Sequence, residues 1–339
     1  MELDINAIAI EFTDFLNEWH SYREPYDDKL DAWLLGLYAE EKRKYKRLDY
    51  KSAPYFSPSS AGKDDRELYV KALGMPKDED DVKPWQRRWT AQGTAIGDWL
   101  QRELLLAERH FEKFTGKKPP FRMARTADGK PFFEDFVHGQ RFFEYGDQRF
   151  SILGTCDGVL EYEASDGTVY RIGLEIKSKQ TSYSETGFNR LTAPKSDHVK
   201  QVTCYSLMYD LDAYLIVYVN VSKKAWFMSE EEFEKHPDFR VFGVDVTDDM
   251  KTAILEKFAY VTKCVAEKTP PALDLEKFRF NNFKRSCALS LSDEEYELLK
   301  AQVRRMMRSR LPEWRKQAYY DAFEYIREVR EQNGSQEAG

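Results

Sequence analysis

Apolar side chains recur at helical spacing in the N-terminal and C-terminal parts of the chain. In residues 5–19 they fall three and four apart, as on the buried face of an amphipathic helix: Ile5, Ile8, Phe12, Phe15, Leu16 and Trp19. A shorter helix ending at Leu73 is predicted to be capped by Ser59 or Ser60. Further helices are predicted over 29–48, 85–114, 198–209, 247–267, 292–310 and 312–332. Pro84 opens the second of these, and Ser292 with Glu295 forms a capping box at the start of 292–310.

The middle of the chain reads as β-structure. Two β-rich runs, 150–162 and 169–177, flank Asp166-Gly167, which is a strong hairpin turn signal. The apolar, β-branched run 213–221 predicts a buried strand, and 223–228 an added edge strand. This order predicts an α/β fold, in which a small mixed β-sheet is flanked by helices and carries helical N- and C-terminal extensions.

The whole chain, 1–339, is predicted to form a single domain, because its length suffices for one large core. Its parts are a helical N-terminal part, an α/β core, a helical C-terminal part and a disordered tail, over 1–120, 121–228, 229–332 and 333–339. A hydrophobic content of 42% is typical of a globular protein. No apolar run reaches the length of about 18 residues that a membrane helix needs, and the N-terminus lacks a secretory pattern, so a cytoplasmic protein is expected.

Charge and cysteine content narrow the chemistry only slightly. The formal net charge of −7 counts mildly against a nucleic-acid-binding protein, but local basic patches decide phosphate binding. One patch runs from Lys42 and Arg43 to Arg47, and another includes Arg304 and Arg305. Solvated helix faces are the alternative explanation for both patches. The 4 cysteines contain no C-x-x-C pair, so neither a thiolate zinc site nor an iron–sulfur cluster is expected.

The two predicted strands carry an acid and then an acid-x-lysine pair. Glu175 and Lys177 share one face of a strand, because side chains alternate with a period of two. With Asp157, the carboxylates could hold Mg²⁺ or Mn²⁺, which prefer oxygen ligands. A strict two-residue turn would pair Asp157 with Ile176 and turn it to the opposite face. The site therefore requires a bulge, for which Gly158 and Gly173 are candidates, or a loop with an odd number of residues.

The following helix adds a polar stripe. His198, Gln201 and Tyr205 fall at i, i+3 and i+7, so they share one face. This stripe is either a solvated surface or a set of side chains that reaches the lysine, a water molecule or a phosphate. Upstream, Gly93 and Gly97 lie one turn apart in a long helix, which indicates either a close approach of another segment or simple tight packing.

Three motifs together resemble those of the PD-(D/E)XK nuclease superfamily, in the branch of RecB-type and phage recombination exonucleases that includes lambda exonuclease: Gly154-Thr155-Cys156-Asp157-Gly158, Leu174-Glu175-Ile176-Lys177-Ser178 and Gln201-x-x-x-Tyr205. The resemblance covers roughly residues 55–228 and implies a PD-(D/E)XK core. It assigns metal binding to Asp157, Glu175 and the Ile176 carbonyl. Lys177 would serve the water nucleophile, and Gln201 and Tyr205 would support the site.

Two upstream segments resemble the same family with departures. The segment from Ser57 to Arg66 lacks the cysteine that some relatives use for a cluster, and Arg66 would contact DNA together with Lys42, Arg43, Arg304 and Arg305. Relatives often carry a His or Glu metal ligand at the position of Gly97. Asp98 or Glu103 could replace this ligand, although the side chain of Asp98 points about 100° away from the position of Gly97 around the helix axis.

The resemblance implies a divalent-metal-dependent deoxyribonuclease that hydrolyses phosphodiester bonds, most often an exonuclease in phage or bacterial recombination and repair. DNA is the expected partner, together with a single-strand annealing protein. A structure-specific endonuclease, or an inactive nuclease fold that binds DNA or supports assembly, are the alternatives. No interface between copies of the chain can be read from the sequence.

Overall fold

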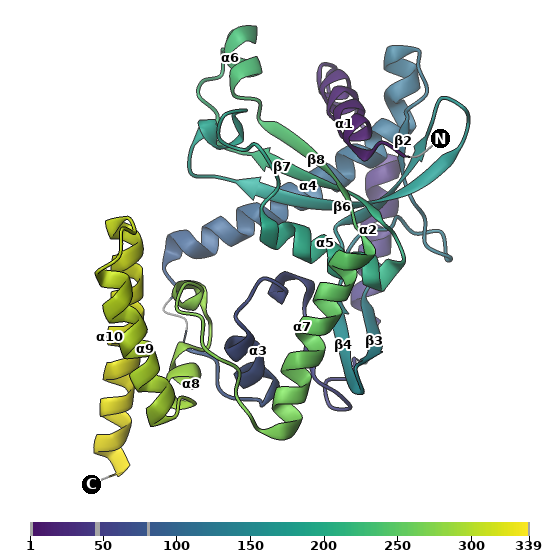
Figure 1. The fold of residues 1–339 in the computed structure, drawn as a ribbon. Helices are drawn as coiled ribbons and strands as arrows, with labels where there is room; N and C mark the ends of the chain where they lie inside the picture. The colour runs from purple at the N-terminus through teal and green to yellow at the C-terminus, as the bar shows by residue number, and fades with distance from the viewer. Residues whose placement is uncertain (1–2, 45–47, 80–81, 338–339) are drawn as a thin grey trace. The chain divides into compact units, whose positions relative to one another are not determined.

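A computed structural model describes residues 3–44, 48–79 and 82–337. Helices and strands alternate through the middle of the chain, and helices dominate both ends (Figure 1). The α-helices are α1 Ile5–His20, α2 Asp28–Lys42, α3 Asp65–Ala72, α4 Pro84–Thr115, α5 Ser196–Tyr209, α6 Glu230–Lys235, α7 Asp248–Glu267, α8 Lys284–Leu289, α9 Asp293–Met307 and α10 Glu313–Glu337. The strands are β1 Tyr55–Phe56, β2 Phe121–Met123, β3 Gly139–Tyr145, β4 Gln148–Gly154, β5 Gly158–Glu163, β6 Val169–Lys179, β7 Ala213–Asn220 and β8 Phe239–Asp245.

The contacts divide the chain into two compact units that interleave along the sequence. Unit 1 comprises Met1–Asp49, Val82–Arg141 and Ile152–Thr252, and unit 2 comprises Tyr50–Asp81, Phe142–Ser151 and Ala253–Gly339. The predicted parts with boundaries at 120 and 228 run consecutively, so they do not contain this interleaving. The α/β fold class is confirmed, since helices cover a five-stranded mixed sheet.

The five-stranded sheet of unit 1 has the order β2-β5-β6-β7-β8. Strands β6 and β7 are parallel, and α5 forms the crossover between them, whereas the other neighbours are antiparallel. Such a crossover is the expected connection for parallel neighbours. The fully buried strand β7 lies between β6 and β8, which explains its continuous run of apolar residues.

The register between β5 and β6 fulfils the condition derived from the sequence. Gly158 pairs with Leu174, and the connecting loop 164–168 has five residues between Glu163 and Val169. This odd loop shifts the register by one residue from that of a two-residue turn. The predicted alternative, a bulge at Gly158 or Gly173, is wrong, because the pairing runs without interruption from Gly158 to Glu163 and includes Gly173 opposite Val159.

Gly173 allows β6 to lie against a buried aromatic ring. A Cβ atom at Gly173 would stand 2.0 Å from Cε1 of Tyr214 on β7, far inside van der Waals contact. Gly243 on β8 is restricted in the same way, since a Cβ there would meet the Ile5 carbonyl oxygen at 2.5 Å. Both glycines are therefore required by close approach between segments.

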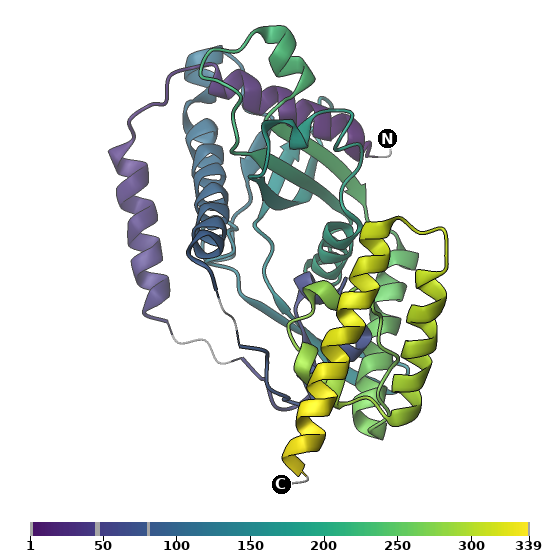
Figure 2. The same cartoon turned by 90° about the vertical axis from the view of Figure 1, so that its left-hand side faces the viewer.

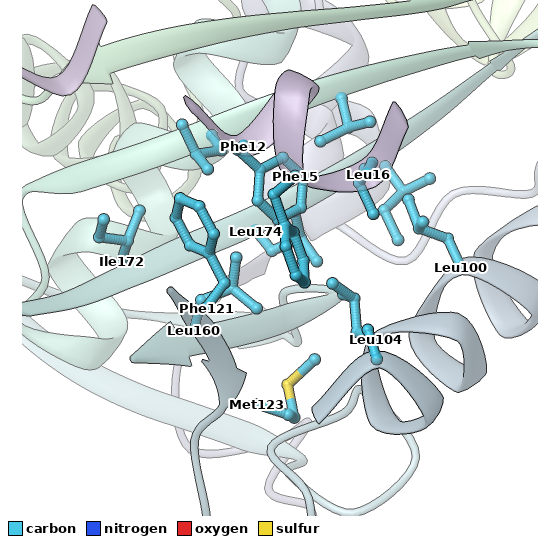
Figure 3. Close-up of a cluster of buried hydrophobic side chains, with 14 of the residues drawn as sticks. Phe12, Phe15, Leu16, Leu100, Leu104, Phe121, Met123, Leu160, Ile172 and Leu174 are labelled. Atoms are coloured by element: carbon cyan, nitrogen blue, oxygen red, sulfur yellow. The ribbon is translucent and has the colours of Figure 1, made fainter. Parts of the chain in front are cut away.

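Helices α1 and α4 cover one face of the sheet. Alternate strand residues such as Leu160, Ile172 and Leu174 pack against Phe12 of α1 and Leu104 of α4 in one buried cluster (Figure 3). Full burial of such side chains contributes about 1.5–3 kcal/mol each. All six apolar residues predicted for the first helix are buried, so that prediction is confirmed.

Helix α2 runs beside α4 (Figure 2). Nε of Arg102 on α4 donates to Oδ1 of Asp31 on α2 at 2.9 Å. Helix α5 contacts β6 and β7 through side chains of the opposite sheet face, such as Lys177 and Tyr218. The face that carries the predicted site residues is therefore the α5 face.

Unit 2 is mainly helical, and α10 packs against α8 and α9. The guanidinium of Arg66 on α3 is fully buried, and its Nη2 donates to Oε1 of Glu295 on α9 at 2.6 Å. Glu295 also completes the predicted capping box with Ser292, which is confirmed. The cap of α3 is Asp64, whose Oδ2 accepts from the Glu67 N–H at 3.2 Å, so the prediction of Ser59 or Ser60 is wrong.

Several boundaries differ from the predictions. The β-rich run 150–162 is broken after Gly154, because β4 belongs to a three-stranded sheet with the order β1-β4-β3. No strand forms over 223–228, and the edge position is taken by β8, which the hydrophobic pattern did not reveal. Helix α2 ends at Lys42, and α10 continues to Glu337 through most of the tail predicted as disordered.

Residues 45–47 of the basic patch lie outside the described residues. No helix in the described ranges combines the length and apolar character needed to cross a membrane.

Candidate active site

Asp157 lies in the short break between β4 and β5, where the chain enters the five-stranded sheet. Its Oδ2 accepts a hydrogen bond from the backbone N–H of Ile176 on β6 at 2.5 Å. Its backbone carbonyl accepts from Nε2 of Gln101 on α4 at 2.6 Å, and Gln101 is itself buried. These two bonds fix Asp157 beside the strand that carries Glu175.

Glu175 and Lys177 project from the same face of β6, and their side chains form an ion pair. Glu175 is 1% exposed, whereas the Lys177 side chain is 23% exposed. Nζ of Lys177 donates to Oε1 of Gln201 at 3.0 Å, and Nε2 of Gln201 donates to the Tyr205 hydroxyl at 3.0 Å. The predicted polar stripe of α5 therefore contacts the predicted lysine.

The two carboxylates of the site oppose each other's ionisation. Burial, and then the charge of Glu175, raise the pKa of Asp157 well above its usual value, although the Ile176 N–H acts in the other direction. Burial also raises the pKa of Glu175, against the lowering effect of Lys177. Lys177 is the one cation that acts on both carboxyls, and Oε2 of Glu175 is buried with no hydrogen-bond partner among the described residues.

The donor set fits a hard divalent cation. Two carboxylates and the Ile176 carbonyl are oxygen donors, the type that Mg²⁺ and Mn²⁺ prefer. The unpartnered oxygen of Glu175 is an orphaned buried acceptor of the kind that a cation satisfies. The residues present therefore fit the metal that the family resemblance implies.

A second acidic group adjoins this pair. Asp98 on α4 and Glu134 and Asp135, which follow β2, each place a carboxylate oxygen within 4.8 Å of the others. The pKa of Glu134 is raised to about 7, first by burial and then by Asp157, Asp135 and Asp98. Glu134 thus lies close enough to Asp157 for strong repulsion and connects the two acidic groups.

Asp98 and Glu103, the two candidates to replace a metal ligand at the position of Gly97, place their carboxylates in different surroundings. Asp98 joins the acidic group despite its offset from Gly97 on the helix. Glu103 does not, because its Oε2 accepts from Nε1 of Trp19 at 2.9 Å and lies 3.6 Å from Nε2 of His20. A Cβ at Gly93 would contact Oγ of Ser178 at 3.3 Å, which supports close approach there, whereas Gly97 faces open space.

The predicted DNA-contacting residues differ in accessibility. Lys42 and Arg43 are at the C-terminal end of α2, and Nζ of Lys42 pairs with Oδ1 of Asp135 at 3.2 Å. Arg304 and Arg305 are exposed on α9. Arg66 has no exposed surface, so contact with a phosphate would require its exposure. Contact of these residues with DNA stays a prediction.

Sequence reasoning missed Gln101 and Glu134. Gln101 lies among apolar residues of α4, and a buried glutamine on an apolar helical face is the signal that could have identified it. Glu134 and Asp135 lie between Phe133 and Phe136 in an aperiodic segment, where two adjacent acids flanked by aromatic residues were the available signal.

No model of a known protein family matches this chain, and no curated protein matches its sequence. Among solved structures, it is similar at 11% identity to SSO0001, over 78% of this chain and 98% of that one, with a TM-score of 0.38. It is similar at 11% identity to the alkaline exonuclease LHK-Exo from Laribacter hongkongensis, over 63% and 91% of the chains, with a TM-score of 0.35. A phage-related exonuclease from Haemophilus somnus 129PT is similar at 14% identity, over 62% and 81%, with a TM-score of 0.32. These scores are low, so function has to be derived from the side chains.

Proposed function

We propose that this protein is a divalent-metal-dependent deoxyribonuclease that hydrolyses phosphodiester bonds. One observation carries the proposal: the carboxylate of Asp157 and the buried carboxylate of Glu175 lie beside an ammonium that Gln201 holds in place. Hydrolysis of a phosphodiester requires a positioned water molecule and stabilisation of negative charge on the phosphate. This group of side chains can supply both.

The roles follow from the contacts. Asp157, Glu175 and the Ile176 carbonyl would hold Mg²⁺ or Mn²⁺, which when bound supplies Lewis-acid stabilisation of the phosphate. The side chain of Lys177 is 23% exposed, so its ammonium would orient the attacking water and stabilise the hydroxide that forms when the water gives its proton to solvent. Gln201 fixes the ammonium of Lys177, and Tyr205 fixes the amide of Gln201.

The acidic group next to the centre supports the same reading. Asp98 and Glu134 offer carboxylates where Gly97 offers none. Glu134 and Asp157 repel each other in the absence of a positive charge, so a cation shared by these groups would relieve that repulsion. We assign Asp98 and Glu134 as additional oxygen donors of the metal site.

The expected substrate is DNA, and the expected activity is that of an exonuclease in phage or bacterial recombination and repair, acting in the cytoplasm with a single-strand annealing protein as partner. This finer assignment rests on the resemblance of the three motifs. No iron–sulfur cluster is expected. Exposed Arg304 and Arg305, together with Lys42 and Arg43, are candidates for phosphate contacts.

Incubation with end-labelled linear duplex DNA and Mg²⁺ or Mn²⁺ tests the proposal. The wild type should shorten the linear duplex and leave closed circular DNA intact. Lys177→Ala should lose about 10²–10⁴-fold in rate, the usual contribution of an acid–base group, while it retains DNA binding. Lys118→Ala is the matched control, because Lys118 is an exposed lysine of the same unit outside the site.

The outcomes separate the alternatives. Cleavage of closed circles would replace the exonuclease with an endonuclease. DNA binding without cleavage in either metal, unchanged by Lys177→Ala, would indicate a binding module on a nuclease fold. Neither binding nor cleavage by a folded wild type would refute the proposal.

A further inference from the structure

Strand β6 carries a second lysine beyond the proposed centre. Lys179 follows Lys177 by two residues, so both project from the same face of the sheet, about 7 Å apart along the strand. Nζ of Lys179 lies 5.0 Å from the centre of the Tyr218 ring on β7. Lys179 is half-buried and forms no ion pair within the described part of the chain.

Lys195 comes from the start of α5 and lies beside Lys179. Its backbone N–H donates to the Tyr218 hydroxyl at 2.9 Å, and Nδ1 of His198 lies 2.8 Å from the same hydroxyl. The tautomer of His198 decides whether Nδ1 donates to this hydroxyl or accepts its proton. In both tautomers Nε2 stays free of this contact and can take a further partner.

Positive charges predominate around Lys179, Lys195 and His198. Burial and then the charges of Lys177, Lys179 and Lys195 lower the pKa of His198 to about 3, so the imidazole stays neutral. Burial and Lys195 lower the pKa of Lys179 to about 8. The opposing acid is Glu185, whose Oε2 accepts from the Thr181 N–H at 3.0 Å. Lys179 and Lys195 therefore lie close enough for their positive charges to oppose each other, and a phosphate between them would offset that repulsion.

The start of α5 adds to the positive field. Lys195 is its N-cap and makes no side-chain cap bond. The first backbone bonds of this helix come from the N–H groups of His198 and Val199, which donate to the Lys195 carbonyl. Unused amides in the first turn favour an anion, although the carboxylate of Asp197 offsets part of this effect.

We propose that Lys179 and Lys195 bind a phosphate of the DNA strand next to the phosphate that is cleaved. This subsite rests on the proposed nuclease function. Lys177 faces the scissile phosphate in that function, and Lys179 stands one strand repeat farther along the same face, so it meets the neighbouring phosphate of a strand that follows β6. His198 adds a neutral imidazole to the same group. The subsite therefore sets the register of the strand over the carboxylates.

The test measures binding without cleavage, in an Asp157→Asn background, by fluorescence anisotropy of labelled oligonucleotides between 50 and 200 mM salt. Lys179→Gln should reduce the slope of log affinity against log salt by about 0.7–0.9, the value for one lost phosphate contact. Lys179→Arg should restore the slope, and Lys118→Gln should leave it unchanged. Circular dichroism checks that every variant is folded.

A strand with one neutral methylphosphonate next to the cleaved linkage identifies the phosphate. On this strand, Lys179→Gln should cause no further loss of affinity, because the contact is already absent. A full additional loss on the neutral strand would overturn the proposal, and so would an unchanged salt slope. Two other results would assign the subsite to a terminal or a free phosphate and so overturn the proposal. One is a loss of affinity confined to strands with a terminal phosphate, and the other is competition by inorganic phosphate that Lys179→Gln abolishes. If the wild type cleaves DNA, any of these results refutes only the subsite and not the nuclease function. If the wild type neither binds nor cleaves DNA, both the subsite and the nuclease function are refuted.

Discussion

Gly173→Ala is predicted to destabilise unit 1 through a clash within the sheet that carries the site. The new Cβ would lie 2.0, 2.3 and 2.7 Å from three atoms of the Tyr214 ring, where ordinary contact begins at 3.4 Å. The methyl group is therefore about 1.4 Å too close (3.4 − 2.0). Tyr214 is fully buried, so the ring can move only by displacing the side chains packed around it. We expect a loss of about 3 kcal/mol in the free energy of unfolding, the upper end of the overpacking range.

Urea unfolding followed by circular dichroism measures this loss. With a slope of about 2–3 kcal/mol/M, the midpoint should fall by about 1 M. Gly158→Ala is the matched control on the paired strand. Its Cβ would contact Met123 and Leu174 at 3.4–3.5 Å, which is ordinary packing. The control should change stability by less than about 1 kcal/mol, with a small gain possible from the reduced entropy of the unfolded chain.

A double-mutant cycle ties the effect to the ring. In a Tyr214→Leu background the aromatic ring is absent, so Gly173→Ala should cost less than about 1 kcal/mol. If the cost of Gly173→Ala is equal in both backgrounds, or if the two glycine substitutions are equally tolerated, the close approach of β6 and β7 is not what requires this glycine.

Three further predictions follow from contacts of the site and of unit 2. Gln201→Leu removes the acceptor that holds the Lys177 ammonium. If the proposed function is correct, the cleavage rate should fall about 10–100-fold with the fold retained, as for other supporting residues, and an unchanged rate contradicts the positioning role. His198 has a pKa lowered to about 3, so below pH 6.5 the unfolded chain binds a proton there that the folded protein does not. Between pH 7 and 5 the wild type should lose about 1 kcal/mol more stability than His198→Gln, after a discount for solvent screening, and parallel pH profiles would refute this. Glu295→Ala leaves buried Arg66 without its partner and should lower the free energy of unfolding by about 2 kcal/mol, less than for a fully buried pair because Glu295 is partly exposed. Glu297→Ala is an exposed control on the same helix and should cost under about 0.5 kcal/mol. Thermal unfolding measures both.

The parts of the fold that the sequence predicted well are those with strong local periodicity. The apolar stripe of α1, the proline start of α4 and the capping box of α9 each depend on residues within a few turns of one another. The requirement for an odd loop between β5 and β6 also followed locally, since strand geometry alone links register to the face of Asp157.

What could not be predicted depends on contacts between distant segments. Strand β8 has mixed burial and pairs with β7 only after a helical insertion, so its pattern is weak. Glu134 reaches the site from an aperiodic segment, and no periodicity indicates where its side chain points. From the sequence alone, Arg66 is predicted to be an exposed cation, because its partner Glu295 lies 229 residues away in the chain.

The interleaving of the two units has a consequence for synthesis of the chain on the ribosome. Every segment of unit 1 has been made once residue 252 is added, so the sheet and its carboxylates can fold while the last helices are still being translated. Unit 2 must wait, because Arg66 is made early and its partner Glu295 arrives near the end. During that interval the segment 50–81 carries an unpaired cation and exposed apolar residues, which makes it the part of the nascent chain most in need of a chaperone.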